Sequence, residues 1–327
     1  MTSGEDSLIA RYFRPLATDP GAFGLGDDAA VLDGRGDEIV VTTDAIVEGV
    51  HFLSDDPPET LARKALRVSL SDLAAKGATP AGFVLTLALR SADDAWLASF
   101  ARGLGEDIGL FGCPLLGGDT VSTPGPLMVS ITAFGRVPTG KMVRRSNAKP
   151  GDRVVVTGTI GDAALGLDIL KGGAVATVLD DDVAAKEMLV GRYRVPQPRN
   201  ALAKAVRDHA HAAMDVSDGL AGDLAKLCAA SGVSAVVDAQ SIPLSAAAAA
   251  LLTRGTVGIE VLVAGGDDYE ILCTVPEAAF EAFAQGAGLA GVAVTSIGTV
   301  IAGTSSPRFL DGQGREIGLP RLSYSHF

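Results

Sequence analysis

The sequence predicts an α/β (α+β) protein of two domains, and three observations support this class. Apolar, β-branched runs at residues 39–41 and 153–157 predict buried strands. Helical periodicity follows several of these runs, for example over residues 59–76. The segment NAKPGD, residues 147–152, is turn-like and lies between two predicted strands. We therefore expect an N-terminal domain over residues 1–137 and a C-terminal domain over residues 150–327.

The composition excludes several classes of protein. With 327 residues, 47% of them hydrophobic and 20% charged, the chain is compact and globular. A formal charge of -12 argues against nucleic acid or an anionic membrane surface as a partner. The three cysteines are far apart and show no CxxC spacing, so neither disulfides nor a zinc site are expected. The longest apolar run, residues 81–89, is too short to cross a bilayer, and the start MTSGEDSLIARYF has no signal-peptide core. We expect a cytoplasmic protein.

The first half of the chain alternates helices and strands. Gly77 follows the apolar helix around Asp72 and is expected to end it. The predicted elements are a helix at 5–13, an acidic turn at 26–28, strand 39–41, helix 59–76, strand 83–89, helix 93–109, and strands 114–116 and 127–137.

The second half continues this alternation. The segment DVSDGL, residues 215–220, predicts a turn that leads into a helix with Leu224 and Leu227 on its apolar face. The predicted elements are strand 153–157, a helix of which residues 162–170 are the first part, helices 180–190 and 199–209, a helix after residue 218, and a strand within 265–275.

Five acidic clusters carry the chemistry that we expect. Carboxylates beside Gly, Ser or Thr supply the hard oxygen ligands that Mg²⁺ prefers, so the clusters together predict one divalent-metal site. Asp72 lies among apolar residues, where an unpaired carboxylate would be costly. The clusters are GDD at 26–28, TTD at 42–44, SLSD at 69–72, GGDT at 117–120 and DVSDGL at 215–220.

Two of these clusters have a second interpretation that the residues alone leave open. Asp27 and Asp28 could be an ordinary solvated turn. Asp215 and Asp218 lie at a predicted helix N-terminus, which favours a bound anion. Ser217 or Asp218 could equally be the N-cap of that helix.

One motif only imitates a phosphate-binding loop. GRVPTGKM, residues 135–142, nearly matches GxxxxGK[ST] after a strand. However, Met142 replaces the metal-binding hydroxyl, and the turn-like RRSNAKPGD that follows predicts no helix. We expect no P-loop here.

Eight motifs together carry a resemblance to a known family. They are GEDSLIARYF, GDDAAVL, TTDAIVEGVHF, SLSDLAAKGATP, GGDT, RSNAKPGD, DVSDGL and GGDDYE. In this combination and order, over nearly the whole chain, the sequence resembles the thiamine-monophosphate kinase family, within the superfamily of aminoimidazole ribonucleotide synthetase.

The resemblance implies a fold, a reaction and a set of site residues. The fold has two domains, and the N-terminal sheet pairs across a homodimer. The reaction is ATP- and Mg²⁺-dependent transfer of the γ-phosphoryl group to thiamine monophosphate, which gives thiamine diphosphate and ADP. By motif, several Mg²⁺ ions are expected on Asp28, Thr42, Thr43, Asp44, Asp72, Asp119, Asp215 and Asp218; ATP on Gly118, Asp119, Arg145 and Ser217; and thiamine monophosphate on His51, Glu270 and Tyr324. If the motif alignment is shifted by one residue, Asp27 takes the place of Asp28, and Arg144 takes the place of Arg145.

The expected chemistry needs no catalytic side chain. The second pKa of a phosphate monoester is about 6, so the acceptor is already an anion near pH 7. Metal ions remove the repulsion between two anions and align them, and we expect direct in-line transfer without a phosphoenzyme.

Alternatives remain for two substrate residues and for the function. His51 could be a packed histidine, and Glu270 could simply point away from its strand. Other members of the superfamily, of the aminoimidazole ribonucleotide synthetase, selenophosphate synthetase or hydrogenase maturation type, share an acidic ATP site. The selenophosphate synthetase type uses a reactive Cys or selenocysteine near its N-terminus, whereas the first cysteine here is Cys113. The hydrogenase maturation type presents a C-terminal cysteine, whereas the last residue here is Phe327.

Overall fold

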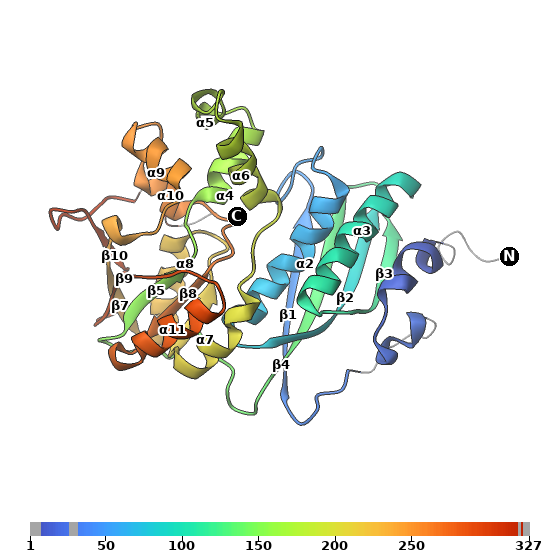
Figure 1. The fold of residues 1–327 in the computed structure, drawn as a ribbon, viewed down its shortest axis with the longest axis horizontal. Coiled ribbons are helices and arrows are strands. Elements are labelled where there is room, and N and C mark those ends of the chain that lie inside the picture. The colour runs from blue at the N-terminus through green and yellow to red at the C-terminus, as the bar shows by residue number, and fades with distance from the viewer. Residues whose placement is uncertain (1–7, 26–31, 320–321, 323–327) are drawn as a thin grey trace. The chain divides into compact units, whose positions relative to one another are not determined.

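The computed structural model describes residues 8–25, 32–319 and 322, and the chain forms two compact units (Figure 1). Unit 1 comprises Met1–Leu73 and Ala78–Lys141. Unit 2 comprises Ala74–Gly77 and Met142–Phe327. The end of one helix, residues 74–75, thus belongs to the second unit.

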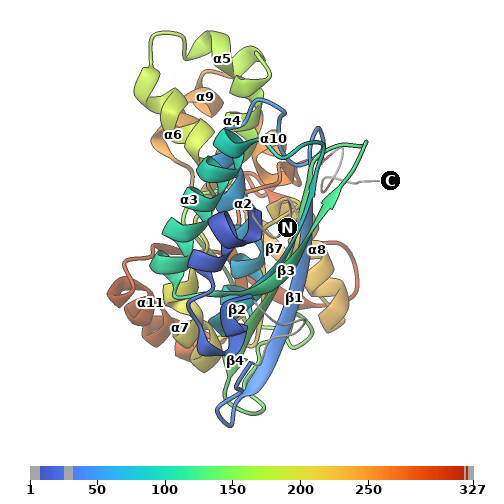
Figure 2. The ribbon, with the colours of Figure 1, turned by 90° about the vertical axis from the view of Figure 1, so that its right-hand side faces the viewer.

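Unit 1 contains a four-stranded sheet with the order β1-β4-β2-β3. β1 pairs antiparallel with β4, β4 pairs antiparallel with β2, and β2 runs parallel to β3. Helices α2 and α3 cover one face of this sheet (Figure 2). The elements are η1 Ile9–Phe13, η2 Arg14–Leu16, η3 Pro20–Leu25, β1 Glu38–Val47, α2 Pro58–Ala75, β2 Thr79–Leu89, α3 Asp94–Phe111, β3 Leu115–Ser122 and β4 Met128–Val137.

The core of unit 1 lies between these two helices and the sheet. α2 buries residues spaced by three or four positions, such as Leu66, Leu70 and Leu73, as its periodicity predicts. α2 and α3 approach closely at Gly103, where a Cβ atom would lie 2.3 Å from the carbonyl oxygen of Glu59. Other fully buried core residues are Phe83, Leu87, Leu97, Phe100, Leu104 and Leu115.

Two strands of unit 1 are longer than their apolar runs predict. β1 continues to Val47 and β3 continues to Ser122, so the TTD and GGDT motifs lie within strands and not at their ends. β1 is also an edge strand, and the expectation that residues 39–41 are all buried is wrong. Val41 is 57% exposed because it lies on the sheet face opposite α2, whereas Val40 is buried.

Unit 2 contains a six-stranded sheet with the order β10-β7-β9-β5-β8-β6. β10 runs parallel to β7, and the other neighbouring strands are antiparallel. The elements are β5 Arg153–Thr157, α4 Asp162–Leu170, α5 Ala174–Val178, α6 Val183–Arg194, η4 Asn200–Leu202, α7 Ala203–His209, β6 Ala212–Asp215, α8 Leu220–Ser231, β7 Val233–Asp238, η5 Ala239–Ser241, α9 Ala246–Thr253, α10 Ile259–Ala264, β8 Ile271–Val275, η6 Glu277–Ala279, α11 Phe280–Leu289, β9 Val294–Ala302 and β10 Arg308–Leu310.

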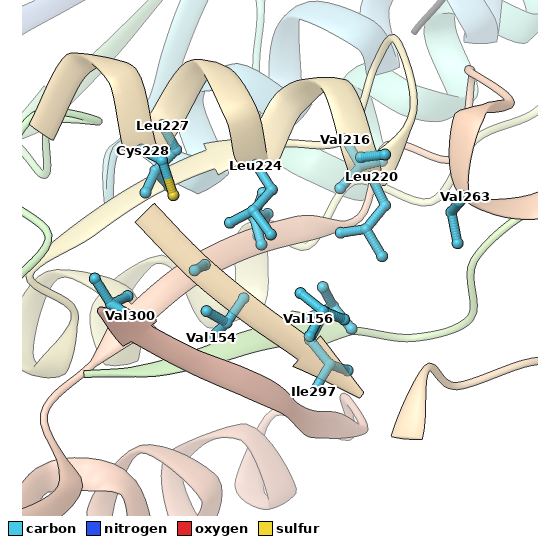
Figure 3. Close-up of a cluster of buried hydrophobic side chains, with 14 of the residues drawn as sticks. Val154, Val156, Val216, Leu220, Leu224, Leu227, Cys228, Val263, Ile297 and Val300 are labelled. Atoms are coloured by element: carbon cyan, nitrogen blue, oxygen red, sulfur yellow. The ribbon is translucent and has the colours of Figure 1, made fainter. Parts of the chain in front are cut away.

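The two faces of the unit 2 sheet carry different hydrophobic clusters. α8 places Leu220, Leu224 and Leu227 over Val154 and Val156 of the central strand β5 (Figure 3). Residues of α7 and α11 pack with the opposite face of β5, where successive side chains alternate. The members of that second cluster include Val155, Val206, Ala213, Cys273 and Phe283.

Candidate functional site

Three predicted metal ligands of unit 1, Thr42, Asp44 and Asp72, lie close together between β1 and α2. Thr42 and Asp44 are two residues apart on β1 and point to the same side of the strand. Ser69 and Asp72 are three residues apart on α2 and share one face of the helix. The Ser69 Oγ donates to Asp44 Oδ2 at 2.8 Å, and the Thr42 hydroxyl donates to Asp72 Oδ2. Two carboxylates and two hydroxyls therefore converge here.

The electrostatics of this group suit a divalent cation. Burial raises the pKa of Asp44 to about 6, the negative charge of Asp72 raises it as well, and the hydrogen bond from Ser69 opposes both effects. A cation held by both carboxylates would remove their repulsion. Carboxylate and hydroxyl oxygens are hard ligands, so this donor set fits Mg²⁺.

The other predicted metal ligands do not all join this group. Asp119 lies in register with Thr86, Ser130 and Ala45, which places it on the sheet face opposite Asp44. Thr43 also lies on that open face, with its Oγ1 3.0 Å from Thr132 Oγ1. Within residues 8–25, 32–319 and 322, no three His, Cys, Asp or Glu side chains lie close enough to hold a metal ion. Within unit 1, Asp119 and Thr43 thus lie on the sheet face opposite Asp44, and the assembly of one site from all five motifs stays a prediction.

Three residues of the expected site fall outside the described residues. They are Asp28, its alternative Asp27, and Tyr324. Their roles stay predictions.

His51 lies in the turn that follows β1, and two contacts hold it. Its Nδ1 accepts a hydrogen bond from the backbone N–H of Val47 at 3.1 Å. Because a backbone N–H can only donate, the neutral ring carries its own proton on Nε2. The carbonyl oxygen of His51 accepts from Lys64 Nζ at 2.9 Å, and Lys64 is only 2% exposed. A contact between His51 and thiamine monophosphate stays a prediction.

The DVSDGL and GGDDYE motifs of unit 2 lie side by side. β6 ends at Asp215, and backbone hydrogen bonds then join the two loops. The N–H of Val216 donates to the Glu270 oxygen, and the N–H of Tyr269 donates to the Val216 oxygen, both at 2.8 Å. A third bond joins the N–H of Asp267 to the Ser217 oxygen at 2.8 Å. Predicted ATP and substrate residues are therefore neighbours within unit 2.

The start of α8 is not capped as the N-cap interpretation predicts. Its N-cap residue is Gly219, and neither Ser217 nor Asp218 caps the helix with its side chain. Instead the buried carboxylate of Asp223, in the first turn, accepts from the backbone N–H groups of Ser217 and Asp218 at 3.0 Å each. Lys226 Nζ reaches both Asp218, at 2.5 Å, and Asp223, at 2.8 Å. Burial raises the pKa of Asp223.

Glu270 lies in the interior of unit 2 and has no exposed surface. Its carboxylate accepts from Arg192 at 2.7 Å, from Arg199 at 2.6 Å and from the Thr157 hydroxyl at 2.6 Å. The backbone passes close by at Gly158, whose φ is +56°, and a Cβ atom there would lie 2.1 Å from Glu270 Oε1. A carboxylate bound by two guanidinium groups has a structural role, so direct contact with a ligand stays a prediction for Glu270.

Sequence reasoning missed the two arginines that hold Glu270, and it missed Ser69 and Lys64. Ser69 lies in the SLSD cluster, but sequence reasoning assigned it no role of its own, and the other three lie outside the motifs; each contacts a residue distant in sequence. Arg192, for example, lies 78 residues before Glu270.

Arg144 and Arg145 are both exposed at the start of unit 2. The Arg144 carbonyl oxygen accepts from the N–H of Ala213, and the Arg145 oxygen accepts from the Ser231 hydroxyl at 2.8 Å. Backbone contacts thus fix both residues equally. The segment GRVPTGKM, residues 135–142, is followed by turns and irregular backbone through residue 152. The helix that a phosphate-binding loop requires is therefore absent there.

Family models match both halves of the chain. Residues 26–137 match the AIR synthase related protein, N-terminal domain, and residues 149–309 match the AIR synthase related protein, C-terminal domain. With its two α/β units, the chain is therefore a member of the AIR synthase related proteins, and the predicted fold class is confirmed.

Similarity to individual proteins narrows this class. The chain is 47% identical over 324 residues to the thiamine-monophosphate kinase of Caulobacter vibrioides, covering 97% of this chain and 89% of that one. A crystal structure of thiamine-monophosphate kinase from Stenotrophomonas maltophilia is 36% identical, with a TM-score of 0.81, and covers 95% of this chain and 96% of that one. The structure of AaThiL complexed with AMPPCP and TMP is 28% identical, with a TM-score of 0.78 and coverage of 94% and 97%. The chain belongs to the thiamine-monophosphate kinase family.

Proposed function

We propose that this chain transfers the γ-phosphoryl group of ATP to thiamine monophosphate and releases thiamine diphosphate and ADP. The observation that carries this proposal is the 47% identity, over nearly its full length, to a thiamine-monophosphate kinase. The similarity to AaThiL, which was solved with AMPPCP and TMP, agrees with ATP and thiamine monophosphate as the two substrates.

Mg²⁺ ions are the proposed cofactors. Asp44 and Asp72 would hold one ion, and their paired carboxylates support this assignment. The further proposed ligands, by family resemblance, are Asp28, Thr42, Thr43, Asp119, Asp215 and Asp218. When bound, Mg²⁺ neutralises charge between donor and acceptor phosphates and aligns them.

The side chains of this protein have binding and orienting roles in the proposal. The acceptor phosphate, with a second pKa of about 6, needs no general base near pH 7. His51 donates from Nε2 to a phosphate oxygen of thiamine monophosphate, and Arg145, Gly118 and Ser217 bind ATP. Transfer is direct and in line, so no side chain becomes phosphorylated. A phosphoaspartate isolated during turnover would contradict this route.

The N-terminal domain, residues 1–137, is the proposed ATP, Mg²⁺ and dimerisation domain, and residues 150–327 form the C-terminal domain. The open sheet face of unit 1, with Val41 57% exposed, supports pairing with a second copy in a homodimer. A cytoplasmic location agrees with three free, buried cysteines. None of the helices in the described ranges is long and apolar enough to span a membrane.

The test is an assay of ADP release with ATP and Mg²⁺, with and without thiamine monophosphate, in which thiamine diphosphate is followed by chromatography. We expect stoichiometric diphosphate formation that stops when EDTA removes Mg²⁺ and is lost in Asp44→Asn. Hydrolysis of ATP without the acceptor, or no turnover, would favour another activity of the superfamily, of the aminoimidazole ribonucleotide synthetase, selenophosphate synthetase or hydrogenase maturation type.

A further inference from the structure

We propose that Ser69 is a positioning residue that holds Asp44 in the orientation needed to bind a metal ion, and that Thr42 holds Asp72 in the same way. This inference rests on the proposed function, because it concerns the Mg²⁺ site of that reaction. It adds Ser69, which the family resemblance does not assign.

The geometry forms a reciprocal pair of hydrogen bonds. The strand supplies one hydroxyl, Thr42, and one carboxylate, Asp44. The helix supplies one hydroxyl, Ser69, and one carboxylate, Asp72. Each hydroxyl donates to the carboxylate of the other element. Side-chain repeats of two residues in a strand and of about three and a half in a helix bring these positions opposite each other.

The Ser69 hydroxyl has one proton to donate, and the distances show where it goes. Ser69 is completely buried. Its Oγ lies 2.8 Å from Asp44 Oδ2 and 3.5 Å from the carbonyl oxygen of Ile131, so the carboxylate is the better acceptor. The bond uses Oδ2 of Asp44 and restricts rotation of the carboxylate, which orients Oδ1 as well.

The helix that carries Ser69 is itself firmly anchored. Two residues earlier, Arg67 is 1% exposed, and its Nε donates to Asp107 Oδ2 of α3 at 2.6 Å. A hydrogen bond from a hydroxyl on such a rigid element orders the carboxylate before the metal binds. The entropy cost of metal binding is therefore smaller. Partners of this kind typically change metal affinity about 10- to 100-fold.

The test is direct binding of Mn²⁺, a stand-in for Mg²⁺, to the full chain in the presence of AMPPCP, followed by electron paramagnetic resonance. We expect Ser69→Ala to raise the Kd for Mn²⁺ about tenfold. The matched control is Ser71→Ala, since Ser71 is also a buried serine of α2 and is 1% exposed. The control should stay within about twofold of the wild type. In kinase assays, Ser69→Ala should shift the Mg²⁺ concentration for half-maximal rate more than kcat at saturating Mg²⁺.

The outcomes separate this inference from the proposed function. Unchanged Mn²⁺ affinity in Ser69→Ala, or an equal loss in Ser71→Ala, would overturn the inference and leave the kinase proposal standing. A wild-type chain that binds no Mn²⁺ would overturn both. If Ser69→Ala does not fold, Ser69→Cys keeps a side chain of the same shape, slightly larger, but has only a weak donor, and it must then show the weaker binding.

Discussion

Glu270 and Arg199 form an ion pair in unit 2 in which the carboxylate has no exposed surface, with Arg199 Nε 2.6 Å from Glu270 Oε2. Arg192 contacts the other oxygen, Oε1, at 2.7 Å. Removing one partner of such a pair leaves the opposite charge buried without compensation, which is more costly than the pair is stabilising.

We expect Glu270→Gln to lower the free energy of unfolding by roughly 3 kcal/mol, because two guanidinium groups would then face a neutral amide. Urea unfolding followed by circular dichroism measures this change. If the side chain also touched thiamine monophosphate, the KM for that substrate would rise while the KM for ATP stayed constant. A variant with normal stability and only that KM effect would contradict the structural role.

The raised pKa of Asp44 predicts a pH-dependent gain in stability for Asp44→Asn in metal-free protein. Burial is the main cause, and the pKa is about 6 in the folded protein against a model value of 3.8. Below about pH 4 the carboxyl is protonated in both folded and unfolded chains, so it has no effect there. Above pH 6 the folded chain must hold an ionised, buried carboxylate, and this cost is fully present.

At pH 8 with EDTA, Asp44→Asn should therefore be more stable than the wild type by up to about 3 kcal/mol, and the difference should shrink toward pH 4. Urea unfolding at both pH values measures it. The same variant should lack kinase activity. A wild type that is more stable than Asp44→Asn at pH 8 would show that the carboxylate has a compensating partner.

Lys64→Met tests whether the turn of His51 depends on its buried ammonium group. The substitution keeps the aliphatic chain but removes the donor to the His51 carbonyl oxygen, which is 2.9 Å away in the wild type. We expect the KM for thiamine monophosphate to rise on the order of tenfold, equivalent to about 1.4 kcal/mol, with little change in the KM for ATP.

Lys204→Met is the matched control, because Lys204 is an exposed lysine of α7 that pairs with Asp208. It should leave both KM values unchanged. Equal changes in the two KM values for Lys64→Met would indicate a general loss of structure in unit 1.

Arg145→Ala and Arg144→Ala decide which arginine binds ATP. Both side chains are exposed and both backbones are held, so neither substitution should disturb the fold. We expect Arg145→Ala to raise the KM for ATP about tenfold, through loss of a charge-assisted contact, and Arg144→Ala to change it less than threefold. The reverse result would move the ATP contact by one residue. Lys141→Ala should have no effect, since no helix follows the GRVPTGKM segment.

Local patterns predicted much of the fold. The strand 153–157 was predicted with the boundaries that the structure has, and the helix from residue 162 was predicted with the correct start. The helix at 59–76 differs from α2 by one residue at each end. These elements follow from apolar spacing over short windows. The strand with TTD and the strand with GGDT were predicted too short, because a run of polar residues and glycines resembles the end of a strand.

The sequence by itself determined the family, the order of the elements and the residue types of the candidate site, because motifs and periodicity are properties of neighbouring residues. Only the tertiary structure decided the partners: Ser69 with Asp44, Lys64 with the turn of His51, and two arginines with Glu270. It also placed Asp119 and Asp44 on opposite faces of one sheet. The physical reason is that these contacts join residues between 13 and 78 positions apart in the sequence. Over such separations, the spacing of residues along the chain does not predict which side chains meet.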